Sequence, residues 1–353
     1  MLRRLHIASL LTLALKASCA LVATESLDIR LPIGTFRGVS TAQGIEKWIG
    51  IRYAQAPVGP LRFKAPVPVP TVSPDAEVID ASKFGNACPQ LPSNLGAPIA
   101  EDCLFLNSAG AGSVEAHIIY AASRKLFRAG MAESPVGPFK TSPPASVYDE
   151  PDKPFAKLLA NTGCSAGPDA IACLQAVPFD TLLSISNSMI SVVLNNQLWQ
   201  PSIGPPGSFA PTRASTLIEA GEFRHDVAYL AGTNLNEGTS FSVTLLPMNA
   251  EARTPRESDE LFKTFIQALL IDNSTVTEPT FERLFELFPT STTREIPFAT
   301  GNELFDRGEA WYGDEMFVAP RRLFFEHAAP VQDVYAYRFA EFIPGNNITL
   351  GGE

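Results

Sequence analysis

The sequence predicts an α/β fold, and three observations support this prediction. Short segments rich in β-branched and aromatic residues are mixed with longer segments that have helical periodicity. At 353 residues and 45% hydrophobic content, the chain is long enough to bury a substantial core. Its 30 prolines and 24 glycines predict many turns and long loops. The strands are few for this length, so we expect part of the fold to be missing.

The N-terminal part is predicted to contain short strands joined by coil. Residues 33–40 and 45–53 are rich in β-branched and aromatic residues, and the turn at 41–44 should pair them. A proline-rich coil follows as far as Pro98, and residues 104–106 form a further apolar strand.

Helices dominate the rest of the prediction. Two more strands are expected at residues 226–232 and 334–339, with coil from Pro344 onward. Amphipathic patterns predict helices at residues 114–132, 153–161, 168–176, 180–187, 257–270, 280–288 and 301–328. The last of these should break at Pro320, because proline lacks a backbone donor.

Residues 1–20 have the features of a secretory signal peptide. They carry three Lys or Arg residues and no acidic one, and an apolar run over residues 5–15 ends near the small residues 18–20. This run is far shorter than the ~20 apolar residues that span a bilayer, and no later segment is long enough. We therefore expect export, without stable membrane insertion.

The net charge of the chain is acidic. Removing residues 1–20 would take away Arg3, Arg4 and Lys16 and move the formal charge from -10 to -13. Such a charge argues against nucleic acid or an anionic membrane as a partner.

An exported chain of this kind would keep four cysteines, namely Cys88, Cys103, Cys164 and Cys173. An even number predicts two disulfides, and local pairing is the simplest of the three possible connectivities. Sequons at Asn273 and Asn347 suit the same compartment and are candidate glycosylation sites.

One stretch places a serine between a strand and a helix. It reads E-D-C-L-F-L-N-S-A-G-A-G-S-V, residues 101–114, with Ser108 at the corner. A nucleophile elbow has the pattern G-x-S-x-G, because its strained turn brings backbone close on both sides of the serine. Here Gly110 is present, but Leu106 replaces the first glycine. The alternative, which this window alone favours, is that Asn107 or Ser108 is an ordinary helix N-cap.

Several motifs along the chain belong together. They are G-I-R-Y-A (50–54), P-V-G-P-L-R-F (57–63), E-D-C-L-F-L-N (101–107), S-A-G-A-G-S-V (108–114) and G-T-N-L-N-E-G-T (232–239). In combination they resemble the type-B carboxylesterase/lipase family, which includes fungal lipases and cholinesterases. The resemblance runs from about Leu31 to the C-terminus. It implies hydrolysis of carboxylic esters on an α/β-hydrolase fold, which is incomplete here.

The resemblance also implies roles for individual residues. Ser108 would be the nucleophile and Glu237 the acid of a catalytic triad, with the backbone N–H of Ala109 in the oxyanion hole. It implies the disulfides Cys88–Cys103 and Cys164–Cys173, and neither a cofactor nor a metal. Glu237 also follows a predicted strand directly, where open α/β sheets place their sites. The alternative for a single glutamate is an exposed loop carboxylate.

Two parts of the family pattern are absent from this sequence. The H-G-G loop, which supplies most of the oxyanion hole, belongs between Asn107 and Ser108, which are adjacent here. The H-G segment with the triad histidine is expected downstream of the region that ends at Gly352. Without the strands before the elbow, residues 114–127, which include Ile118, Ile119 and Leu126, should lack much of their usual support. No persuasive base is offered by the histidines present, which are His6, His117, His225 and His327.

Three interpretations fit this pattern. The first is a secreted serine hydrolase that acts on a small-molecule or lipid ester. The second is a non-catalytic, cholinesterase-like secreted binding protein. The third, which best accounts for the losses, is an incomplete product of splicing or of an imperfect gene model. As domains we expect a signal peptide at residues 1–20 and a partial carboxylesterase type-B domain at residues 21–353.

Overall fold

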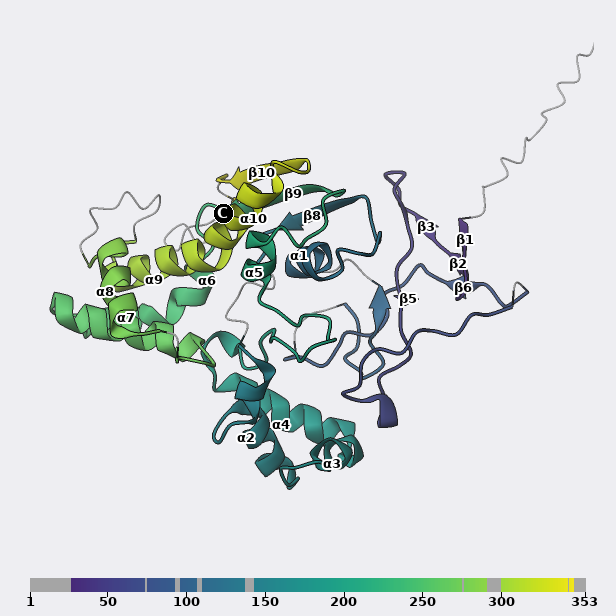
Figure 1. Cartoon of the computed structure of the whole chain (residues 1–353), viewed down its shortest axis with the longest axis horizontal. Coiled ribbons are helices and arrows are strands. Elements are labelled where there is room, and N and C mark those ends of the chain that lie inside the picture. Colours follow the sequence, from purple (N-terminus) through teal and green to yellow (C-terminus); the bar gives the residue numbers. More distant parts are fainter. Residues whose placement is uncertain are drawn as a thin grey trace, which may run out of the picture. The chain divides into compact units, whose positions relative to one another are not determined.

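The computed structural model describes most of the chain after the predicted signal peptide. The described residues are 27–73, 75–92, 96–106, 110–136, 143–274, 276–290, 300–341 and 343–345. They belong to two compact units (Figure 1). The smaller unit contains the residues up to 51 together with 70–83, and the larger one contains residues 52–69 and those from 84 onward.

Short strands are spread along the described chain, and longer helices follow them. The strands are β1 (Asp28–Leu31), β2 (Gly34–Arg37), β3 (Val39–Ser40), β4 (Glu46–Lys47), β5 (Ile51–Arg52), β6 (Ile79–Asp80), β7 (Phe105–Leu106), β8 (Ala129–Glu133), β9 (Ala228–Asn234) and β10 (Val334–Phe339). The helices are α1 (Ala111–Tyr120), α2 (Pro154–Thr162), α3 (Ala170–Ala176), α4 (Phe179–Ser191), α5 (Ala214–Glu219), α6 (Thr239–Ser242), α7 (Pro255–Leu269), α8 (Glu278–Leu287), α9 (Glu303–Gly313) and α10 (Ala319–Ala328).

The smaller unit is built from two-residue and four-residue strands. Strand β2 pairs with β1 in antiparallel register and with β6 in parallel register, around a core that contains Phe36, Ile51 and Ala81. The predicted pairing of residues 33–40 with 45–53 is present only where Val39 faces Lys47 and Ser40 faces Glu46. The turn signal was therefore sufficient to predict this pairing, but not its short extent.

The larger unit contains a parallel sheet in the order β10-β9-β8. Helices α1, α5 and α10 lie beside this sheet (Figure 1). Their buried side chains form one hydrophobic cluster with Tyr229 and Ala231 of β9. Ile118 and Ile119 of α1 are 0% and 2% exposed. The expectation that this segment lacks support was therefore wrong for Ile118 and Ile119, because α1 packs against β8 and α5, whereas Leu126 is 52% exposed.

The other face of this sheet is open to solvent. Met131 and Tyr335 both lie in register with Leu230, so these three side chains form one row across the strands. Met131 is 61% exposed and Tyr335 is 58% exposed. Parallel sheets normally have both faces covered, so this row is an unusual feature of the described residues.

The predicted helix at residues 114–132 was wrong in its second half. Helix α1 ends at Tyr120, and residues 129–133 form β8, whose backbone pairs with β9. Gly130 permits this arrangement, because a Cβ there would lie 2.9 Å from a methyl carbon of Val114. Parallel pairing with a distant strand has therefore outweighed the helix propensity of the local residues.

Helices α6 to α9 form a second core in the larger unit (Figure 1). Local signals start them: Thr254 accepts a hydrogen bond from the N–H of Glu257 before α7, and Asn302 accepts one from the N–H of Phe305 before α9. A π-helical turn at Asp314–Val318 joins α9 to α10. The predicted break at Pro320 is a change of helix type: the π-helical turn ends at Val318, and Pro320, which lacks a backbone donor, lies in the first turn of α10.

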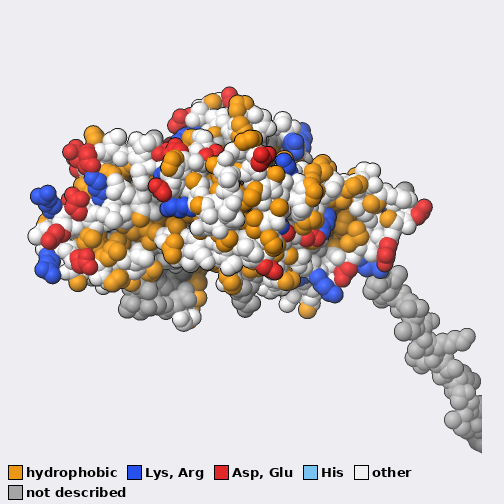
Figure 2. All heavy atoms as spheres, turned by 90° about the horizontal axis from the view of Figure 1, so that it is seen from below, with side chains coloured by type: hydrophobic (Ala, Val, Ile, Leu, Met, Phe, Trp, Pro, Cys, Tyr) orange, Lys and Arg blue, Asp and Glu red, His pale blue; other side chains and the backbone are white. Residues whose placement is uncertain are grey.

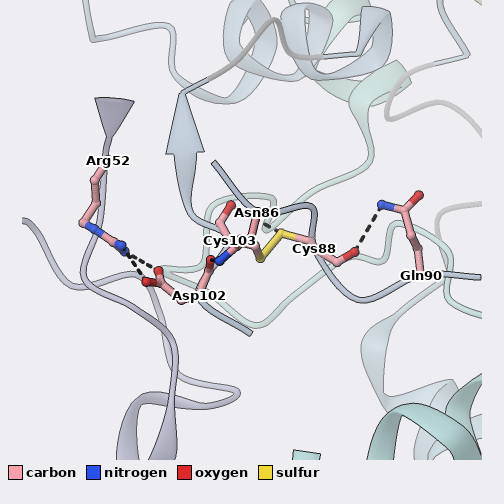
Figure 3. Close-up of a disulfide and its surroundings, with 6 residues drawn as sticks. All are labelled: Arg52, Asn86, Cys88, Gln90, Asp102 and Cys103. Atoms are coloured by element: carbon pink, nitrogen blue, oxygen red, sulfur yellow. Dashed lines mark hydrogen bonds and ion pairs between the residues drawn. A yellow bond between two sulfur atoms is a disulfide. The ribbon is translucent and has the colours of Figure 1, made fainter. Parts of the chain in front are cut away.

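Two disulfides are present, with the pairing that the resemblance implied. Cys88 is bonded to Cys103, and Cys164 is bonded to Cys173 between α2 and α3. Beside the first disulfide, both terminal nitrogens of Arg52 contact the carboxylate of Asp102 at 2.5 and 2.7 Å (Figure 3). The residues that flank the disulfide are thus fixed by an ion pair as well as by the covalent bond.

Charged side chains of both signs are distributed over the surface. On the face drawn in Figure 2, Lys and Arg side chains form separate groups with Asp and Glu among them. Among the described residues, no helix is both long enough and apolar enough to cross a bilayer.

Candidate active site

Glu237 lies in the loop that follows β9, at the carboxyl end of the parallel sheet. Its Oε1 accepts a hydrogen bond from the backbone N–H of Asn234, the last residue of β9, at 2.6 Å. The hydroxyl of Ser134 donates a second hydrogen bond to the same oxygen, also at 2.6 Å. Within the described part of the chain, the other oxygen, Oε2, receives no hydrogen bond. The carboxylate is therefore oriented through one oxygen, which leaves the second for another donor.

Ser134 directly follows β8, the strand next to β9. Its backbone N–H donates to the carbonyl of Gly232 at 2.9 Å, and its φ of 52° lies in the left-handed region. A non-glycine residue in that region is strained, so the contacts around Ser134 must hold it there. The sequence prediction missed this residue, because the preceding segment was interpreted as a helix.

The loop that carries Glu237 is packed closely against α9. At Gly238 an added Cβ would lie 1.9 Å from the carbonyl oxygen of Glu309, so only glycine fits. The hydroxyl of Thr239 donates to the carboxylate of Glu309 at 3.0 Å. These contacts explain why the G-T pair follows Glu237 in the sequence, and they fix the position of the loop.

Arg321 supplies positive charge near Glu237. It lies on α10 and donates to the backbone carbonyl of Tyr337 at 3.0 Å. Burial lowers the pKa of Arg321, while the negative charge of Glu237 acts in the opposite direction. Burial raises the pKa of Tyr337, and the charges of Glu133 and Glu237 add to this effect. Glu237 thus lies in a partly buried group of charged and polar side chains at the sheet edge.

A second carboxyl group, Glu115, is buried beneath the sheet and was not singled out in the sequence. It lies on α1, is 1% exposed, and accepts a hydrogen bond from the hydroxyl of Tyr229 at 2.8 Å. Burial raises its pKa to about 7, although the hydrogen bond from Tyr229 and the charge of Arg321 oppose the shift. Its Oε2 has no hydrogen-bond partner among the described residues. Glu115 is therefore largely protonated below neutral pH.

The described histidines do not contact Glu237. His117 is exposed and packs edge-on against the ring of Phe209. His225 lies at the opposite end of β9 and contacts the carbonyl of Gly221, and His327 contacts the carbonyl of Leu323 within α10. His6 lies outside the described residues.

The other predicted site residues lie partly outside the described residues. Ser108, Ala109 and Asn347 are among those not described, so their predicted roles stay predictions. Asn273 is exposed in the segment after α7. Within the described ranges, no group of His, Cys, Asp and Glu side chains is arranged to hold a metal ion.

The oriented glutamate lies at the carboxyl edge of a parallel sheet, where open α/β folds place their functional residues. The sequence model of the carboxylesterase family matches residues 25–107 and again residues 107–346. This chain belongs to the carboxylesterase family. The two matches meet at Asn107, the position where the sequence motifs on either side are joined directly.

Curated relatives include lipases and esterases. The chain is 26% identical to the secreted triacylglycerol lipase LIP1 of Gibberella zeae over 216 residues, which are 58% of this chain and 34% of the relative. It is 25% identical to lipase 4 of Diutina rugosa over 255 residues, 67% of this chain and 42% of the relative. Over 75 residues it is 47% identical to the para-nitrobenzyl esterase of Bacillus subtilis, covering 19% and 14% of the two chains. The matched part of the chain thus spans less than half of the length of each of these relatives.

A solved structure confirms the fold class. The structure resembles that of Aspergillus niger EstA with a TM-score of 0.67 and 18% sequence identity, over 93% of this chain and 80% of the other. Likeness at this identity shows the fold alone. The predicted α/β-hydrolase fold is confirmed.

Proposed function

We propose that this chain represents a secreted carboxylic-ester hydrolase of the serine type, and that its 353 residues alone are catalytically impaired. Ser108 is the proposed nucleophile and Glu237 the proposed triad acid. The observation that best supports this proposal is the orientation of Glu237, whose Oε1 is held by Asn234 and Ser134. The names of the relatives, which are lipases and esterases, support ester chemistry.

The proposed mechanism requires a nucleophile, a base, an acid that orients the base, and an oxyanion donor. The serine hydroxyl attacks the acyl carbon while a base takes its proton, and the proton later passes to the leaving alcohol. Glu237 would orient that base through its second oxygen. The backbone N–H of Ala109 would donate to the oxyanion of the tetrahedral intermediate.

Two features of these 353 residues support the impairment: the H-G-G motif is missing at the junction, and none of the described histidines contacts Glu237. No H-G-G motif occurs in the chain, and the two family matches meet at Asn107. Loss of one oxyanion donor typically lowers kcat by roughly 10²- to 10³-fold. Loss of the base from a triad lowers it by about 10⁶-fold. With both functions missing, we expect hydrolysis close to the rate in buffer.

Secretion is a separate part of the proposal. The pattern of residues 1–20, the two disulfides and the name of one relative, the secreted triacylglycerol lipase LIP1, support it. We propose a signal peptide at residues 1–20, a partial carboxylesterase domain at residues 21–353, and glycans on Asn273 and Asn347. Expression in a secreting fungal host tests this part. The protein should appear in the medium, and N-terminal sequencing should show that residues 1–20 have been removed. Retention of the protein in the cells would contradict the proposal.

The catalytic part is tested with p-nitrophenyl butyrate. The purified secreted chain and its Ser108→Ala variant should both hydrolyse this ester at the rate of buffer alone. Turnover by the parent chain that disappears in Ser108→Ala would show that the chain is a competent esterase.

Sequencing the natural transcript across the codons of Asn107 and Ser108 tests the origin of the junction. An incomplete product predicts a longer transcript in which a segment with H-G-G separates the two codons. If every transcript joins the two codons directly, the junction belongs to the natural protein.

A further inference from the structure

Strand β8 is an edge strand of the parallel sheet β10-β9-β8 among the described strands (Figure 1). On either side of β8, the carbonyl of Arg128 accepts a hydrogen bond from β9 at 3.3 Å, and the N–H of Ser134 donates one to β9 at 2.9 Å. Backbone groups alternate in direction along a strand, so those of Ala129, Met131 and Glu133 point away from β9. Within the described part of the chain, none of these outward groups has a hydrogen-bond partner.

This edge has few of the features that keep strands from pairing with other chains. Exposed edges are commonly protected by proline, by lysine or by a short length. The sequence of β8 is A-G-M-A-E, which contains no proline and no lysine and carries one charge, at Glu133. Its five residues are the ordinary length of a strand. Strand β8 is therefore suited to pair with a strand of another chain.

The side chains that border the edge are apolar and exposed on one face of the sheet. Met131 is 61% exposed and begins the open row, which continues through Leu230 to Tyr335. Ala132 points to the other face and is 2% exposed in the core. A strand added beside β8 would therefore extend the open row and cover part of Met131.

The edge of β8 is complementary to itself. If two copies of β8 run antiparallel about a twofold axis at Met131, all five residues of each strand overlap. Because the backbone of Met131 points outward, this residue and its counterpart exchange two hydrogen bonds. An axis perpendicular to the sheet keeps both open faces on the same side. The apolar row then continues without a break from one copy into the other.

We propose that β8 pairs in this way with β8 of a second copy, which makes the chain a dimer with one continuous sheet of two three-stranded halves. Other positions of the axis fit less well. An axis at Gly130 or Ala132 leaves part of each strand without a partner, and the axis at Ala132 also places the carboxylate of Glu133 beside Met131. An unrelated strand would not place a matching apolar row beside this one. The proposal does not depend on ester hydrolysis.

Sedimentation velocity of the secreted chain over a range of concentrations tests the proposal. It should show a reversible equilibrium between monomer and dimer. Hydrogen exchange of the peptide that contains residues 129–133 should slow as the concentration rises, because the outward N–H groups become hydrogen-bonded in the dimer. A monomer at every concentration would overturn the proposal, and so would a dimer in which these amides exchange as fast as in the monomer.

Two cysteine variants locate the axis. In the proposed dimer the Cα atoms of the two residues 131 lie about 5.5 Å apart, which a disulfide can span. Met131→Cys should therefore form an intermolecular disulfide on mild oxidation. Tyr335→Cys is the matched control, because Tyr335 is 58% exposed on the same row. Five strand spacings of about 4.8 Å separate its two copies, so it should remain unlinked. Cross-linking of both variants at one rate, or of neither, would contradict the assignment to β8.

Discussion

Ser134 and Glu237 follow neighbouring parallel strands, and the hydroxyl of Ser134 donates a 2.6 Å hydrogen bond to Glu237 Oε1. The two residues are 103 positions apart in the sequence. The pairing of β8 with β9 brings them together, so the carboxylate is oriented by the sheet as well as by its own loop.

Two replacements of Ser134 distinguish the stabilisation by this hydrogen bond from the strain of the left-handed backbone at Ser134. Ser134→Ala removes the donor but keeps a side chain on the left-handed backbone, and it should lower the free energy of unfolding by about 1–2 kcal/mol. Ser134→Gly removes the same donor but relieves the strain, so its loss should be smaller by about 1 kcal/mol. Urea denaturation measures both. Equal stability of the parent and both variants would show that the contact stabilises nothing.

Glu115 should make the stability of the fold depend on pH. Its folded-state pKa of about 7 lies above the ordinary value of 4.5, because burial disfavours the charged form. The protonated form is therefore favoured by folding: this contribution is complete below pH 4.5 and is lost as the pH rises through 7. The shift corresponds to a loss of at most about 3 kcal/mol at high pH.

The Glu115→Gln variant tests this dependence. Glutamine keeps an acceptor for the hydroxyl of Tyr229 and carries no charge at any pH. Relative to the parent, the variant should gain stability between pH 5 and pH 9 in denaturant titrations. Glu222→Gln, which changes an exposed carboxyl group, should follow the parent. A constant difference between Glu115→Gln and the parent at all pH values would contradict the prediction.

The open row of Met131, Leu230 and Tyr335 should make the chain associate. Exposed apolar patches on a sheet are typical sites of association. Placing glutamate at Met131 and Tyr335 should reduce the average mass seen by light scattering, with little change in stability. Val192→Glu is the matched control, since it adds a charge at a position that is 84% exposed on a different element. If the parent chain is monomeric at high concentration, the row does not drive association.

Much of the fold was predictable where local patterns decide the structure. The predicted strand at residues 334–339 coincides with β10, and the helices at residues 257–270 and 280–288 match α7 and α8 within a few residues. Strand β8 was not predictable in this way. Its residues A-G-M-A-E carry no strand signal, and they form a strand because β9 offers a parallel edge for pairing.

In the candidate site, too, the residues that depend on local sequence were predictable and those that depend on distant contacts were not. The position of Glu237 just after a strand was predictable from the sequence, while its role as triad acid stays a prediction. Ser134 was not, because its role depends on a contact between two distant loops and its strand was hidden. Glu115 was not either, since an acidic residue in an amphipathic segment normally faces solvent, whereas here Tyr229 pairs with it inside the core.

The central proposal is that Ser108 corresponds to the nucleophile of the family and that these 353 residues alone do not activate it. A fluorophosphonate reacts covalently with an activated serine, so mass spectrometry of the treated protein measures activation without requiring full turnover. The folded chain should carry no more label on Ser108 than a urea-denatured sample does. Rapid, stoichiometric labelling of Ser108 in the folded chain alone would contradict the account.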